Sequence, residues 1–233
     1  MQNTSRLVTE QHLVEVGEGQ AVGAILYRAQ EPTTGAHLVL AHGAGAGQTS
    51  AFIRDFAAAL AERGVGVLTF NFPYMEAKRR LPDRPEILEN CFRATIDAMG
   101  KLIGAGSGLF IGGKSMGGRI ASQFAARPGP VPLGLAGLVL LGYPLHPPGK
   151  PDQLRTGHLP QLKLPVLIFQ GTRDVFGTPD ELRPWFTGPG VSIRPVEGGD
   201  HSFKIPKSRG RDQEEVFSEI QDGIRDWVVE VAH

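Results

Sequence analysis

A serine lies in the glycine-rich pentapeptide Gly113-Lys114-Ser115-Met116-Gly117, directly after an apolar run. This G-x-S-x-G pattern is typical of a sharp strand-to-helix turn that lifts the serine hydroxyl off the end of a sheet. Glycines flank the serine because the strand and the helix pass too closely there to leave room for a Cβ atom. We interpret Ser115 as a nucleophile and the Met116 N–H, at the start of the helix, as one donor to an oxyanion.

A serine hydroxyl is a weak nucleophile unless a base takes its proton, and the chain has an acid and a base further along. Asp174 follows an apolar run, and His201 follows the last such run, behind two glycines. His201 would accept the Ser115 proton, and Asp174 would fix the tautomer of the imidazole. Asp200 is adjacent to His201 and poorly placed to reach its Nδ1 atom, so we expect it to be a loop residue.

A second glycine-rich loop, residues 42–47, follows the apolar run 38–41. An oxyanion hole needs a second N–H, and we assign it to Ala44, with Gly43 as the next choice. We expect His42 to be a structural hydrogen-bonding residue rather than a second base. The alternative for this segment is a flexible turn without a chemical role.

The same serine also ends a different motif. Residues Gly108 to Ser115 satisfy the phosphate-binding pattern G-x-x-x-x-G-K-S. However, residues 109–111 are apolar and belong to a predicted strand, whereas a phosphate-binding loop would leave the strand there. A nucleotide site would also leave His201 without a role. We therefore favour the nucleophile interpretation over a phosphate loop or an ordinary glycine-rich turn.

Eight apolar or β-branched runs predict strands, and helical patterns separate most of them. Two early runs form a hairpin, and continuous apolar runs of four to seven residues suit strands that are covered on both faces. We therefore expect one α/β domain, residues 1–233, with an eight-stranded, mostly parallel sheet and helices on both faces. The predicted strands are 13–16, 22–28, 38–41, 65–70, 109–112, 135–141, 166–169 and 191–196.

Helix signals lie between these runs. A helix over 52–63 ends at Gly64, and the pair Asp83 and Glu86 predicts a capping box for the next helix. Thr178 and Glu181 predict a second capping box. The final helix carries its apolar residues on one face: Val216, Phe217, Ile220, Ile224, Trp227, Val228 and Val231.

The composition excludes several classes of protein. The 24 Lys and Arg residues balance the 24 Asp and Glu residues, so the chain offers no bulk attraction for nucleic acid or an anionic membrane. Residues 1–10 lack the apolar region of a signal peptide, and the run 135–141 is far shorter than the roughly 18 residues of a membrane helix. One cysteine, Cys91, cannot form an intrachain disulfide. We expect a cytoplasmic protein with no metal or cofactor, and the oligomeric state stays open.

With the serine, the acid and the histidine in this order, the chain resembles the α/β-hydrolase superfamily, near the dienelactone hydrolases. More narrowly, it resembles a branch that includes testis-expressed hydrolase-like proteins and the domain of an NSL acetyltransferase-complex subunit. The resemblance runs from about residue 38 to residue 227. Five segments carry it: 41–45 (AHGAG), 113–119 (GKSMGGR), 141–146 (LGYPLH), 165–171 (PVLIFQG) and 200–202 (DHS).

The resemblance implies an α/β-hydrolase fold and hydrolysis of a carboxylic ester, or of a related acyl bond in a thioester or lactone, through an acyl-serine intermediate. The partner would be a small-molecule acyl substrate. Dienelactone hydrolases use a cysteine where this chain has Ser115, and we expect Cys91 to be a core residue. The alternative is a binding or scaffold module that keeps the fold without catalysis.

Two loops could shape a substrate site. The connection 142–164 is proline-rich and too short for a cap domain, and it offers Tyr143 and His146 as walls of a cleft. The loop after residue 70 offers Tyr74 and the basic Arg79, which would suit an anionic substrate. The alternative for both loops is a solvated surface.

Overall fold

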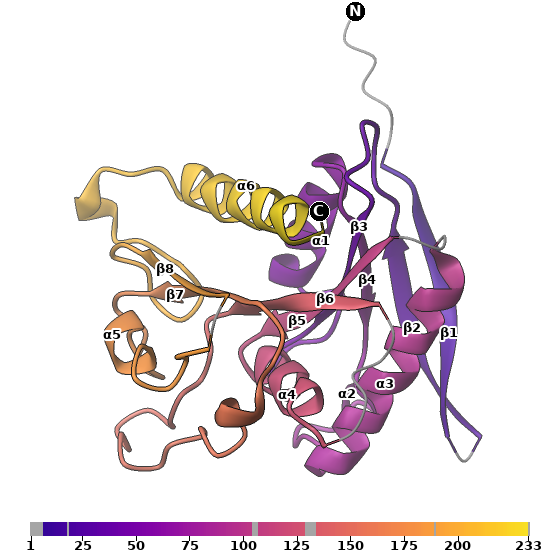
Figure 1. The fold of residues 1–233 in the computed structure, drawn as a ribbon, viewed down its shortest axis with the longest axis horizontal. Coiled ribbons are helices and arrows are strands. Elements are labelled where there is room, and N and C mark those ends of the chain that lie inside the picture. The colour runs from indigo at the N-terminus through magenta and orange to yellow at the C-terminus, as the bar shows by residue number, and fades with distance from the viewer. Residues whose placement is uncertain (1–6, 18, 104–106, 129–133, 189, 233) are drawn as a thin grey trace, which may run out of the picture.

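Eight strands form one sheet in the order β1-β2-β4-β3-β5-β6-β7-β8. The computed structural model describes residues 7–17, 19–103, 107–128, 134–188 and 190–232 (Figure 1). The strands are β1 (Thr9–Gly17), β2 (Gln20–Tyr27), β3 (Ala36–Ala41), β4 (Gly66–Phe70), β5 (Gly108–Lys114), β6 (Leu135–Leu141), β7 (Val166–Gly171) and β8 (Val191–Val196).

The sheet is parallel from β4 to β8 and antiparallel at its N-terminal edge. Strands β1 and β2 pair as the predicted hairpin, and β2 pairs antiparallel with β4. All the other neighbours are parallel. The mostly parallel, eight-stranded sheet predicted from the sequence is therefore confirmed.

Helices cover both faces of the sheet (Figure 1). Helices α1 and α6 pack on one face and contact each other, while α3 and α4 pack together on the other. In β3, Leu38 and Leu40 face the α1 and α6 side, and Val39 and Ala41 face the other. This two-sided burial explains why the strand has no polar alternation. The helices are α1 (Ala51–Glu62), α2 (Pro73–Glu76), α3 (Pro85–Leu102), α4 (Met116–Ala125), α5 (Pro179–Leu182) and α6 (Gln213–Ala232).

One of the two predicted capping boxes is present. Thr178 and Glu181 form it at the start of α5. The prediction for Asp83 and Glu86 was wrong, because α3 begins at Pro85 after the N-cap Arg84, which makes no side-chain cap. Proline at the first position supplies a helical φ angle and has no N–H, so the helix start has one fewer donor without a partner.

The carboxyl ends of β3, β5, β6, β7 and β8 lie at one edge of the sheet, and the loops that leave them hold the residues of chemical interest. The connection from β6 to β7, which is described throughout, contains a single 3₁₀ turn, Leu159–Gln161, and builds no cap domain. Within the described ranges, no helix combines the length and apolar character needed to cross a bilayer.

Candidate active site

Ser115 occupies a strained turn between β5 and α4. Its backbone has φ 53° and ψ −117°, in a region that L-residues rarely adopt. The turn brings the backbone of α4 against β3: a Cβ atom on Gly117 would lie 2.6 Å from the carbonyl oxygens of Ala41 and His42. A Cβ on Gly113 would meet the Ala41 oxygen at the same distance. The flanking glycines are thus required by close backbone approach, as the sequence predicted.

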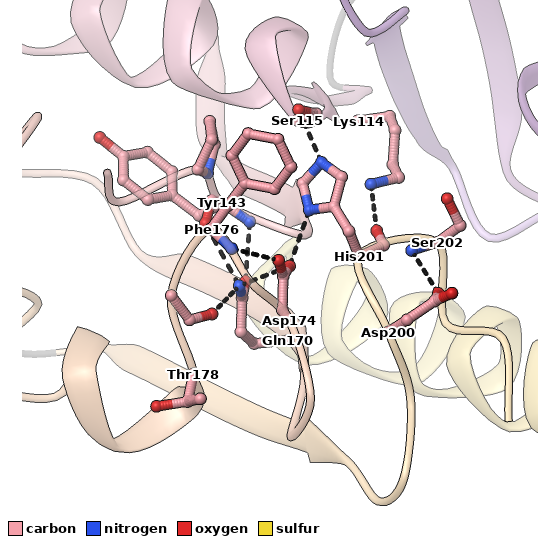
Figure 2. Close-up of polar contacts among 12 residues, drawn as sticks. Lys114, Ser115, Tyr143, Gln170, Asp174, Phe176, Thr178, Asp200, His201 and Ser202 are labelled. Atoms are coloured by element: carbon pink, nitrogen blue, oxygen red, sulfur yellow. Dashed lines mark hydrogen bonds and ion pairs between the residues drawn. The ribbon is translucent and has the colours of Figure 1, made fainter. Parts of the chain in front are cut away.

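A chain of hydrogen bonds links Ser115 to two residues from other loops (Figure 2). His201 Nε2 lies 2.9 Å from Ser115 Oγ, and His201 Nδ1 lies 2.7 Å from Asp174 Oδ2. The three side chains come from the loops after β5, β7 and β8, which the parallel sheet brings to one edge. The geometry suits transfer of the serine proton to Nε2 while the carboxylate holds Nδ1–H.

The Asp174 carboxylate is fully buried and held by two donors besides His201. Its Oδ1 accepts the Phe176 N–H at 2.8 Å, and its Oδ2 accepts Gln170 Nε2 at 2.9 Å. Gln170 also receives the Tyr143 N–H on its Oε1 at 2.7 Å, so its amide orientation is fixed. The sequence did not identify Gln170, although an amide at the end of a buried apolar strand was an available signal.

The loop that carries His201 is a tight turn built on Asp200. The Asp200 Oδ1 atom accepts the N–H groups of Ser202 and Lys204 at 2.8 and 2.9 Å. Asp200 therefore stabilises the loop from within, as expected, and Asp174 is the acid that reaches the imidazole. The Phe176 ring packs on the His201 ring, with 4.3 Å between their centroids.

Lys114, the residue before the serine, connects β5 to the loop that carries His201. Its buried Nζ donates a hydrogen bond to the His201 carbonyl oxygen (Figure 2). Gly142 leaves the room for this contact, since a Cβ there would lie 2.9 Å from Nζ. The ammonium lies 5.7 and 5.6 Å from the ring centroids of Phe52 and Phe203. Burial lowers the pKa of Lys114 to about 8, against the opposing effect of the Asp174 and Asp200 carboxylates.

The loop after β3 lies against Ser115 and is pinned from behind. His42 is buried, and its Nε2 accepts the Phe72 N–H at 3.1 Å, so its Nδ1–H donates to the Gly43 carbonyl at 2.7 Å. Burial lowers the pKa of His42 to about 4, which keeps the ring neutral. The Tyr74 hydroxyl donates to the Ala44 carbonyl at 2.9 Å. His42 thus has the structural hydrogen bonds that were expected.

A cavity of about 620 Å³ opens beside Ser115 and His201, and we call it the Ser115 cavity. It lies between the loop after β3, helix α1, the histidine loop and helix α6. Its walls are mainly apolar and include four phenylalanines. The charged or amide-bearing residues that line it are Lys114, Gln221, Asp55 and Lys204. The aromatic residues are Phe52, Phe56, Phe176 and Phe217.

The structure corrects the predicted walls of the substrate site. None of the four predicted residues, Tyr74, Arg79, Tyr143 and His146, lines the Ser115 cavity. Tyr143 is fully buried and donates to the Arg155 carbonyl, and Tyr74 is fully buried behind the loop after β3. His146 is also buried, with its Nδ1 at the Pro147 carbonyl. Arg79 is exposed and forms an ion pair with Asp83 at 2.6 Å. The cavity instead opens between α1 and α6.

Two other expectations from the sequence are met. Residues Gly108–Lys114 form strand β5, so this backbone cannot wrap a phosphate as a P-loop would. Cys91 is a buried core residue of α3, and burial raises the pKa of its thiol to about 12.

Solved structures with the same fold cover nearly the whole chain. A dienelactone hydrolase from Anabaena variabilis matches with a TM-score of 0.72 and 18% identity, over 97% of this chain and 99% of that one. An α/β serine hydrolase without lid from Xanthomonas campestris matches with a TM-score of 0.73 and 17% identity, over 94% of each chain. Est1E from Butyrivibrio proteoclasticus matches with a TM-score of 0.70 and 14% identity, over 94% of this chain and 98% of that one.

The sequence itself gives the family. Residues 34–229 match the family described as alpha/beta hydrolase domain, which spans β3 to α6 and includes every residue of the hydrogen-bonded chain at Ser115. The protein belongs to this alpha/beta hydrolase family.

Proposed function

We propose that this protein is a serine hydrolase that cleaves a carboxylic ester or a related acyl bond, in a thioester or lactone, through an acyl-serine intermediate. The observation that carries the proposal is the hydrogen-bonded chain from Ser115 through His201 to the buried Asp174. The likeness to a dienelactone hydrolase and to Est1E agrees with this class of reaction.

In the first half of the reaction, Ser115 Oγ attacks the acyl carbon while its proton moves to His201 Nε2. The carbonyl π electrons move to oxygen and form a tetrahedral oxyanion. As the oxyanion collapses, the bond to the leaving group breaks, and the leaving group takes the proton from Nε2. The product is an acyl ester of Ser115 and a neutral imidazole.

In the second half, water replaces the leaving group. His201 Nε2 takes a proton from water as the water oxygen attacks the acyl carbon, and the second oxyanion collapses with release of Ser115 Oγ. The proton returns from Nε2 to Oγ, and the acid product leaves. Asp174, held by Gln170 and the Phe176 N–H, stabilises the imidazolium at each stage.

We assign the oxyanion to the N–H groups of Met116 and Ala44. Met116 begins α4, where the first N–H groups of a helix have no partner within it. A trans peptide points its C=O and N–H in opposite directions, so the bond from His42 to the Gly43 carbonyl turns the Ala44 N–H away from His42. Gly43 and Ala44 both line the Ser115 cavity, and Gly43 is the second choice as donor.

A substrate panel tests the proposal. We expect purified protein to hydrolyse members of a panel of 4-nitrophenyl esters, acyl thioesters and lactones, and Ser115→Ala and His201→Ala to lose that activity while keeping their melting temperatures. If the folded wild-type protein hydrolyses none of them, the site serves another purpose, such as the binding or scaffold role that the sequence left open.

Several broader assignments accompany this proposal. We propose that the chain is related to the branch of testis-expressed and NSL-subunit-like hydrolases, and the motifs at 41–45, 113–119 and 141–146 support this. We also propose one domain over residues 1–233, a cytoplasmic location, and a small-molecule acyl substrate with no nucleic-acid or membrane partner. The balanced charge and the single sheet that joins residues 9 to 196 support these assignments.

A further inference from the structure

The aromatic wall of the Ser115 cavity is a packed cluster contributed by two helices. On α1, the rings of Phe52 and Phe56 stack with 4.4 Å between their centroids. On α6, Phe217 meets Phe56 edge-on at 5.4 Å and Phe52 at 6.2 Å. Because these rings pack against each other, they form a firm apolar surface for an aromatic or bulky aliphatic group.

Gln221 interrupts this apolar wall. It lies one turn after Phe217 on α6, it lines the cavity, and its side chain and backbone together are only 8% exposed. Across the described parts of the chain, no hydrogen bond involves its amide. By contrast, the buried amides of Gln170 and Gln48 both donate to backbone carbonyls, at Gly177 and Gly23 respectively.

Neither polar atom of the Gln221 amide is fully buried, so water in the cavity can hydrogen-bond to the amide in the free protein. Gln221 is therefore a polar group that the fold leaves free at the wall of the proposed substrate cavity. A substrate group with an oxygen atom at this position would replace that water as a hydrogen-bond partner, whereas a hydrocarbon group would displace the water without replacing it.

We propose that Gln221 forms a recognition subsite for substrates whose buried part has an apolar body that carries an oxygen substituent, such as a hydroxyl, carbonyl or carboxylate. This inference rests on the proposed function, because it concerns the substrate of the same site. It adds a rule of selectivity: a plain hydrocarbon group of the same shape leaves the Gln221 amide unpaired and binds less well.

The charges around the cavity favour an oxygen substituent over an amine. Lys114 and Lys204 both line the cavity, and the single carboxylate among the lining residues, Asp55, pairs with Arg54 at 2.8 Å. An ammonium group on the substrate would therefore meet cations. A hydroxyl, carbonyl or carboxylate oxygen would meet N–H donors instead.

Binding to a protein that cannot turn over tests the subsite apart from catalysis. In the Ser115→Ala background, titration calorimetry compares 4-hydroxyphenylacetate with 4-methylphenylacetate, and the 3-substituted pair in the same way. Hydroxyl and methyl groups have similar size, so each pair isolates the hydrogen bond. We expect the hydroxylated acid of at least one pair to bind about tenfold or more tightly.

Variants then assign the preference to the amide. Gln221→Met keeps the length of the side chain and removes its hydrogen bonds, and it should reduce the preference to less than about threefold. Gln153→Met, the same change at an exposed loop residue, should preserve the preference. Each of these changes is made in the Ser115→Ala protein, and the resulting double variants are compared at temperatures where circular dichroism shows that they are folded.

Two outcomes overturn the inference. One is equal binding within both pairs to the folded Ser115→Ala protein, and the other is a preference that survives Gln221→Met. A protein that hydrolyses no ester would contradict the proposed function, but the outcome of this binding test does not depend on hydrolysis. If Gln221→Met does not fold, the two ligand pairs still show, with the Ser115→Ala protein, whether the cavity prefers an oxygen substituent. Gln221→Glu then assigns the preference to this side chain, because a carboxylate there repels a carboxylate substituent but accepts a hydrogen bond from a hydroxyl.

Discussion

Replacing Lys114 with methionine should change how the stability of the fold depends on pH. The ordinary lysine pKa is 10.5, and burial lowers that of Lys114 to about 8 in the folded protein. Between these two values the unfolded chain binds a proton that the folded protein does not. The free energy of unfolding therefore rises with pH in this window.

The size of the effect follows from the two pKa values. The fall from 10.5 to about 8, at about 1.36 kcal/mol for each pH unit, corresponds to about 3 kcal/mol. Below about pH 8 the folded protein carries the full cost of a buried ammonium, and this cost disappears as the pH approaches 10.5. Lys114→Met never carries it. The difference in unfolding free energy, wild type minus variant, should therefore increase by about 3 kcal/mol between pH 7 and pH 10.5.

Urea denaturation followed by tryptophan fluorescence measures this difference at each pH, because other groups that titrate in the window cancel between the two proteins. Lys150→Met, at an exposed lysine, provides the matched control and should show no such trend. A difference between wild type and Lys114→Met that stays constant from pH 7 to pH 10.5 would refute the reasoning. The variant should also lose kcat, since the His201 carbonyl loses its donor and small displacements of a base are costly.

Three further predictions concern the site and its supports. Asp174→Asn should lower kcat by about 10⁴-fold with little change in melting temperature, because the amide holds the wrong imidazole tautomer; steady-state kinetics and calorimetry check this. Gly117→Ala should destabilise the fold by more than about 3 kcal/mol, because its Cβ would meet two carbonyl oxygens at 2.6 Å. Gly100→Ala in α3, where a Cβ has open space around it, should instead stabilise the fold by about 0.5–1 kcal/mol. Thermal unfolding of the two variants measures both effects. Burial lowers the pKa of His42 from 6.5 to about 4, so the unfolded chain binds a proton at this residue at a higher pH than the folded protein does. The unfolding free energy of the wild type should therefore fall by about 3 kcal/mol relative to that of His42→Asn between pH 6.5 and pH 4. Urea denaturation at both pH values measures this change.

The proposed nucleophile, base and acid could be identified in the sequence because each follows a continuous apolar strand. Parallel strands bring their carboxyl ends to one edge, so Ser115, Asp174 and His201 had to lie near one another once the strands were identified. The glycines around Ser115 carried additional information, since only close backbone contact explains them.

The Ser115 cavity could not be identified in the same way. Tyr74 and Tyr143 also follow strands, yet their side chains turn into the interior, and the sequence does not tell which way a residue after a strand points. The cavity depends on the approach of α1 to α6, where Arg63 pairs with Asp222 across 159 positions of the chain at 2.8 Å. Contacts of that range have no local pattern, so Phe217 could be predicted as part of one helix face but not as a cavity wall, and Gln221 was not identified.

The residues that hold Asp174 and the His201 loop in place were missed for a related reason. Lys114 and Gln170 occupy positions in the strands where the pattern called only for apolar or variable residues. Their partners, the His201 carbonyl and the Asp174 carboxylate, are fixed by loop geometry rather than by sequence spacing. Polar residues at the ends of buried strands are the signal that would have identified them.

Labelling with a fluorophosphonate probe tests the central claim most directly, because the probe reacts with an activated serine and needs no knowledge of the substrate. Peptide mass spectrometry then locates the adduct. We expect one adduct, on Ser115, that is absent in Ser115→Ala and strongly reduced in His201→Ala. No adduct on the folded wild-type protein, or an adduct on another residue, would contradict the account of Ser115 as a nucleophile activated by His201.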